Sequence, residues 1–136
     1  MTISDMDKII LRNMINSSQD VNALELNVVY LAVWSAENYL YNKMRDLNPE
    51  EVAKSKETTN DLEKLYREVL EKYRKAKEGW ERCDKILSEG TFSETIWDEA
   101  EYNTSEFFNF SNKVTHKCED IRQEMLKNIR DSGVKP

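Results

Sequence analysis

Apolar and small residues recur along the middle of the chain at alternating intervals of three and four. A helix with this spacing presents one continuous coiled-coil-like seam. At 1.5 Å per residue, a single helix here would run for about 60 Å. Only other helices can bury a seam of that length, so the pattern predicts an all-α, antiparallel bundle of long helices. The seam consists of Val52, Ser55, Thr59, Leu62, Tyr66, Val69, Tyr73, Ala76, Trp80, Cys83 and Leu87.

Capping residues divide the rest of the chain. Ser4 is suited to begin a helix, as is Asn48 followed by Pro49, and Gly90 is suited to end one. The polar run at 16–20 is expected to interrupt the first helix. Helices are therefore predicted at about 4–16, 21–47, 49–89 and 92–130, with a frayed tail at 131–136, all within one helical-bundle domain of residues 1–136.

The interruption at 16–20 leaves two arrangements open. If it is only a kink, the chain forms a three-helix rod with a broken first helix. If the short first segment folds back, the result is a bundle of four helices with a short N-terminal one.

The predicted helix at 21–47 is unusually apolar. Nine of the eleven residues from Leu26 to Ala36 are apolar, and they cover nearly the whole helix circumference. An outer helix keeps one face in water, so something else has to cover Tyr30 and Trp34. Either the N-terminal segment or a second subunit could do so, and we expect a homodimer because such patches mark interfaces.

Several aromatic residues are candidates for a surface role. Trp97, Tyr102 and Phe108 fall off the seam predicted for the last helix. Together with the apolar helix they define the candidate interface, which comprises Tyr30, Val33, Trp34, Trp97, Tyr102 and Phe108.

Acidic residues gather at the start of the last helix, where 94–106 contains no basic residue. They form a candidate acidic docking patch for a basic partner, made of Glu94, Asp98, Glu99, Glu101 and Glu106. The plainer interpretation is favoured: acids complement the positive end of the helix dipole, and a block of like charge is usually a solvated face.

Residues for catalysis or metal binding are scarce. The single histidine, His116, has Lys113 three residues before it, where a di-iron bundle would need a glutamate. Glu68, Glu71, Glu81 and Asp84 are spaced like paired metal-binding acids, but they share one helix and each has a basic partner one turn away. The sequence predicts no catalytic residues, no metal, no cofactor and no enzymatic activity.

Charge and hydropathy narrow the choice of partners. The net charge is −6, with 20 basic and 26 acidic residues, which makes direct binding of nucleic acid unlikely to be the main role. The longest apolar stretch, Val28 to Trp34, is far too short to span a membrane, and no secretory leader is visible. We expect an intracellular, cytoplasmic protein in which Cys83 and Cys118 are buried and unpaired.

These features favour a non-enzymatic protein–protein interaction module, an assembly or adaptor protein that acts through its helix faces. The alternative is a small acidic inhibitor or regulator, of the type found in phages and mobile elements, that binds a nucleic-acid-handling protein complex. The sequence does not indicate the identity of the protein partner.

Overall fold

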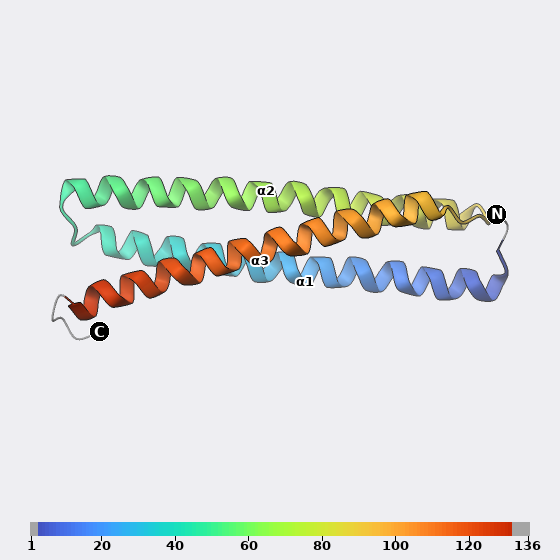
Figure 1. Ribbon diagram of the computed structural model, residues 1–136, viewed down its shortest axis with the longest axis horizontal. Coiled ribbons are helices and arrows are strands. Elements are labelled where there is room, and N and C mark those ends of the chain that lie inside the picture. Colours follow the sequence, from blue (N-terminus) through green and yellow to red (C-terminus); the bar gives the residue numbers. More distant parts are fainter. Residues whose placement is uncertain (1–2, 132–136) are drawn as a thin grey trace. The chain divides into compact units, whose positions relative to one another are not determined.

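Three long helices make up the computed structural model, which describes residues 3–131. They are α1 (Asp5–Met44), α2 (Pro49–Ser88) and α3 (Glu94–Asp131) (Figure 1). The predicted all-α antiparallel bundle is confirmed. The tail was predicted at 131–136, but Asp131 still belongs to α3, and 132–136 lie outside the described residues.

Each helix begins at a side-chain cap. The backbone N–H of Asp7 donates to Ser4 Oγ at 3.1 Å, and that of Glu51 donates to Asn48 Oδ1 at 3.0 Å. At the start of α3, Ser93 Oγ accepts from the backbone N–H of Ile96 at 3.4 Å. These bonds satisfy helix N–H groups that have no partner within their own helix. After α2, Gly90 takes a φ of 83°, the left-handed conformation that favours glycine at a helix end.

The first helix differs from the prediction, because α1 runs unbroken through 16–20. The hydroxyl of Ser18 donates to the carbonyl oxygen of Met14 at 2.9 Å, so this polar side chain bonds to the helix backbone without ending the helix. No Gly or Pro stands in the run to break it. The broken first helix and the four-helix alternative are therefore wrong, and the N-terminal segment does not fold back over the rest of α1.

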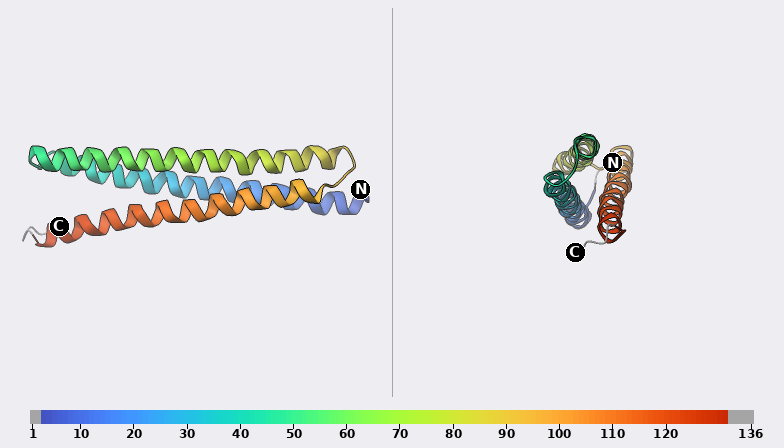
Figure 2. Two further views of the ribbon diagram at one scale, coloured as in Figure 1. Left: turned by 45° about the horizontal axis from the view of Figure 1, so that its top comes forward. Right: turned by 90° about the vertical axis from the view of Figure 1, so that its left-hand side faces the viewer.

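Internal contacts divide the chain into two compact units. Unit 1 comprises Met1–Asn27 and Val69–Phe110, and unit 2 comprises Val28–Glu68 and Ser111–Pro136. Each unit takes one segment from each of the three helices. The course of each helix along the sequence can be followed by its colour in Figure 2. Since all three helices contribute to both units, this division does not test the prediction of a single domain, which stays a prediction.

The core of unit 1 is built around two tryptophans. The rings of Trp80 and Trp97 meet edge to face, with centroids 5.0 Å apart, and Trp80 Nε1 donates to Thr104 Oγ1 at 2.8 Å. Beside them, a Cβ added to Gly79 would lie 3.1 Å from the Cα of Ala100. Glycine therefore permits α2 and α3 to approach closely at this level.

The core of unit 2 is filled mainly by smaller side chains. Its buried apolar residues are Val29, Val33, Ala36, Leu40, Leu62, Val114 and Cys118. Cys118 is a free thiol there, as Cys83 is in unit 1, so the expectation of buried and unpaired cysteines is confirmed.

Candidate functional site: the exposed apolar side of α1

Large hydrophobic side chains exposed to solvent are concentrated on α1. Thirteen such side chains are exposed in the described part of the chain, and eleven of them belong to this helix. The other two are Leu70 on α2 and Tyr102 on α3. Single exposed hydrophobic residues are ordinary, but a concentration on one element is typical of an interaction surface.

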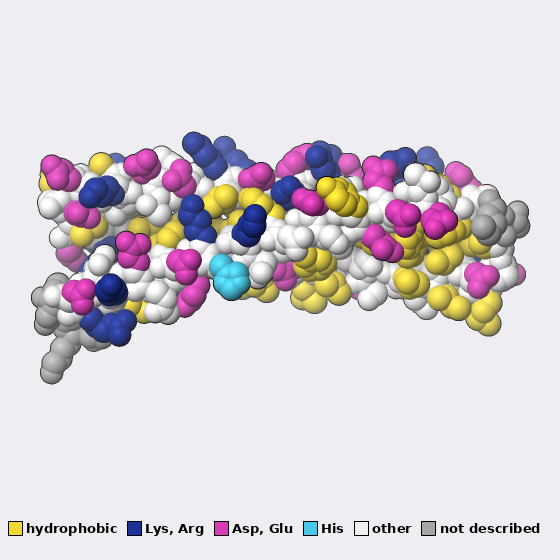
Figure 3. Space-filling view, in the orientation of Figure 1, with side chains coloured by type: hydrophobic (Ala, Val, Ile, Leu, Met, Phe, Trp, Pro, Cys, Tyr) yellow, Lys and Arg dark blue, Asp and Glu magenta, His cyan; other side chains and the backbone are white. Residues whose placement is uncertain are grey.

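In unit 1 the exposed side chains form what we call the N-terminal α1 surface, which comprises Met6, Ile9, Ile10, Met14, Val21 and Leu24. Their exposed fractions lie between 47% and 67%. Figure 3 shows hydrophobic side chains gathered at the lower right, where the N-terminal part of α1 runs in Figure 1. Ile15, within the same stretch, is buried in the core of unit 1. This part of α1 is therefore apolar both on its core side and on its solvent side.

In unit 2 the corresponding side chains form the central α1 surface, which comprises Val28, Tyr30, Leu31, Trp34 and Tyr41. Their exposed fractions lie between 50% and 60%. One edge of this surface is held by a ring contact between Tyr30 and Tyr66, whose centroids are 5.8 Å apart. The structure thus places Tyr30 and Trp34 in solvent, as expected of interface candidates.

Two of the predicted interface residues are not on the surface. Val33 and Trp97 are buried, and Trp97 packs against both Trp80 and Phe92. The register of α3 explains the error: Trp97, Ala100 and Phe107 follow a spacing of three, then seven, and all three are buried. Val33 and Trp97 therefore leave the candidate interface.

The remaining two aromatic candidates differ from each other. Phe108 is half-buried, and its ring lies 5.5 Å from that of Phe107. Tyr102 is well exposed on α3. The surface residues that the sequence analysis does not single out are those of the N-terminal α1 surface. The adjacent pair Ile9 and Ile10 was the available signal, because two neighbouring positions on a helix point about 100° apart.

The acidic patch is largely engaged within unit 1. Carboxylate oxygens of Glu99 and Glu106 lie 4.0 Å from Arg82 and Lys72 respectively, and Glu101 accepts a hydrogen bond from Trp97 Nε1. Glu94 stands in the first turn of α3, where a negative charge complements the helix dipole. Four of the five acids thus have a local structural role, which weakens the case for a dedicated docking patch.

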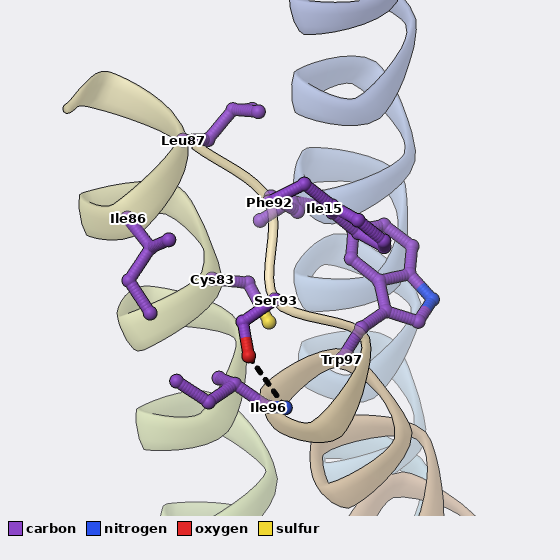
Figure 4. A pocket seen from close by; sticks show the side chains of 8 residues that line it. All are labelled: Ile15, Cys83, Ile86, Leu87, Phe92, Ser93, Ile96 and Trp97. Carbon is purple, nitrogen blue, oxygen red and sulfur yellow. Dashed lines mark hydrogen bonds between the residues drawn. The ribbon is translucent and has the colours of Figure 1, made fainter. Parts of the chain in front are cut away.

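A small cavity lies in unit 1, beside the end of α2 and the start of α3 (Figure 4). Its volume is about 10 Å³, room for a single water, and its lining is almost wholly apolar. The hydroxyl of Ser93 is already used in capping α3. This cavity is a small packing gap and offers no site for a ligand. It is lined by Ile15, Cys83, Ile86, Leu87, Phe92, Ser93, Ile96 and Trp97.

In unit 2, Cys118 is poorly suited to act as a nucleophile. Cys118 and His116 both line an open groove between α1 and α3. Burial, reinforced by the negative charge of Glu37, raises the pKa of the Cys118 thiol to about 11. A thiol with this pKa stays protonated at neutral pH and is a weak nucleophile.

Within the described residues, 3–131, no three or more His, Cys, Asp or Glu side chains are grouped so that they could hold a metal ion. None of the helices over the same range combines the length and the apolar character needed to cross a membrane.

Comparisons of the chain with protein-family models, with curated proteins and with solved structures found no match. The function is therefore proposed from the surface of this chain alone.

Proposed function

We propose that this chain is a non-enzymatic protein–protein interaction module that binds its partner through the exposed apolar side of α1. The observation that carries the proposal is the distribution of exposed large hydrophobic residues, eleven of which lie on this one helix in the described part of the chain. Burying each of them further would contribute roughly 1–2 kcal/mol before the entropic cost of association.

The chemistry of the central α1 surface supports this role. Tyr30 and Trp34 are half-exposed, and tyrosine and tryptophan are enriched among the residues that dominate binding energy at protein interfaces. Leu31 adds an aliphatic side chain between them in the sequence. The combination fits a helix that packs against a helix or groove of another protein.

The alternative, an acidic regulator, has less support. Its patch would have to give up the contacts of Glu99 with Arg82 and of Glu106 with Lys72 in order to meet a basic partner. Both contacts are long and solvent-exposed, so the loss would be small, but no observation favours the exchange.

The test compares two surface variants. Leu31→Glu/Trp34→Glu places charges in the central α1 surface, while Tyr102→Glu places one at an exposed aromatic on α3. Binding to a second copy is measured by sedimentation equilibrium, and binding to other proteins is measured by capture on the immobilised chain. We expect the α1 variant to lose a partner that both the wild type and Tyr102→Glu retain.

The opposite result would overturn the proposal. If charges on α1 leave every interaction intact, then α1 is not the binding element. Circular dichroism serves as the control for folding, because substitutions at half-exposed positions should leave the helix content unchanged.

A further inference from the structure

We infer that the N-terminal α1 surface is the contact with a second copy of this chain, and that the two α1 segments pair antiparallel about a centre near residue 15. The inference rests on the proposed function, since it names the partner for one part of α1. The six residues of this surface all belong to unit 1. The pairing is therefore argued from unit 1 alone.

The order of residues along this surface is self-complementary. In an antiparallel helix pair, the residue numbers of facing positions have a constant sum. With a sum of about 30, Met6 faces Leu24 and Ile9 faces Val21 of the other copy, so apolar residues meet apolar residues near both ends. Toward the middle, the same sum sets Ile10 beside the exposed Asp20, so the contact there is part polar. Such a pattern suits a two-fold symmetric interface, in which each copy offers the same patch.

Charge favours the antiparallel direction over the parallel one. Asp20 is exposed within the same stretch of α1. In a parallel pair in register, Asp20 of each copy would lie beside its counterpart. In the antiparallel pair the two carboxylates are displaced by about 15 Å along the helix axis, beyond the screening length at physiological salt.

The area available matches the needs of a dimer. Six half-exposed side chains present about 600 Å² per copy, at about 100 Å² each. The pair would bury about 1,200 Å² in total, the lower limit for a specific stable interface. A hollow of about 350 Å³ beside Ile9 gives room for a polar side chain of the other copy, because the rest of its lining is polar or charged: Asp5, Lys8, Arg12, Asn13 and Asn16.

The surroundings of the surface disfavour an anionic partner. Arg12, the nearest arginine, is turned toward α2, where it contacts Asp84 at 3.2 Å and Ser88 at 2.9 Å. Asp5, Asp7 and Asp20 are all exposed on this stretch. Lipid headgroups and nucleic acids need Lys and Arg at the edge of the site, and the two basic residues near this one, Lys8 and Arg12, are outnumbered by these acids. The apolar face of another helix is the better fit.

The experiment replaces one facing pair, Ile9 and Val21, with charged residues in two combinations. In the variant Ile9→Lys/Val21→Glu, the introduced lysine of each copy faces the introduced glutamate of the other copy, so opposite charges meet at two places. In the variant Ile9→Lys/Val21→Lys, the introduced lysines of the two copies face each other, so like charges meet at the same two places. Sedimentation equilibrium of the full chain over a range of concentrations measures self-association, and the wild type is the reference.

We expect the dimer dissociation constant of the like-charge variant to be at least tenfold higher than that of the wild type. The dimer dissociation constant of the opposite-charge variant should stay within about threefold of that of the wild type, and high salt should raise it further. If both variants dissociate, the antiparallel register is wrong. If neither does, the contact lies elsewhere.

A wild-type chain that stays monomeric at all concentrations overturns the inference without touching the proposed function. In that case, capture of another protein that depends on Leu31 and Trp34 would still support an interaction module. Loss of both self-association and α1-dependent capture would overturn the two proposals together.

Discussion

The helices α1 and α2 have the same length, 40 residues, but α1 carries 8 charged residues and α2 carries 20. On α2 the charges form contacts with each other, such as the ion pairs of Arg74 with Glu71 and Glu78. The outer side of α1 instead carries Met, Ile, Leu and aromatic side chains. The difference shows that the outer side of α2 is suited to contact with water, whereas the outer side of α1 is largely apolar, which is the basis of the proposed interaction.

The two sides of α1 should respond very differently to the same substitution. Val28 is 51% exposed and its neighbour Val29 is fully buried. We expect Val29→Asp to lower the free energy of unfolding by about 3 kcal/mol or more, because it buries an unpaired charge. Val28→Asp should change it by less than about 0.5 kcal/mol. Urea denaturation followed by circular dichroism measures both, and equal effects would contradict the assignment of the two faces.

A second prediction concerns how tightly α2 is packed against α3. Gly79→Leu places a large side chain where even a Cβ lies 3.1 Å from the backbone of Ala100. We expect a loss of about 1–3 kcal/mol of stability from overpacking, measured by thermal or urea unfolding. Glu78→Leu, at an exposed position one residue away, is the matched control and should have little effect. A Gly79→Leu protein as stable as the wild type would mean that the two helices do not approach closely there.

The smallest expected effect on stability concerns the carboxylate of Glu37 on α1. In unit 2, burial, and then repulsion from Glu63, raise the pKa of Glu37, whose Oε1 is buried with no hydrogen-bond partner among the described residues. An acid whose pKa is higher in the folded state loses stability as the pH rises from its unfolded pKa through its folded one. Glu37→Gln should therefore stabilise the protein at pH 7, by roughly 0.5 kcal/mol after allowance for solvent screening.

The pH dependence provides the check on this prediction. Below the unfolded pKa of a glutamate, both states carry a proton and the gain from Glu37→Gln should vanish. Glu57→Gln, an exposed acid in unit 2, is the control and should show no such dependence. A gain of the same size at pH 3 and pH 7 would show that charge is not its cause.

The sequence by itself determined the helices of this protein and most of their boundaries. The seam from Val52 to Leu87 and the caps at Ser4 and Asn48 are local signals, which depend on residues within a few turns of each other. Such signals can be read without knowing what packs against them.

Only the tertiary structure decided which side of α1 is buried. Because α1 is apolar nearly all round, its periodicity does not separate Ile15 and Val29, which are buried, from Met14 and Val28, which are exposed. The same holds for Trp97, whose burial depends on the register of α3 against Trp80. These outcomes depend on contacts with α2 and α3, and such contacts are set by packing between segments far apart in the chain.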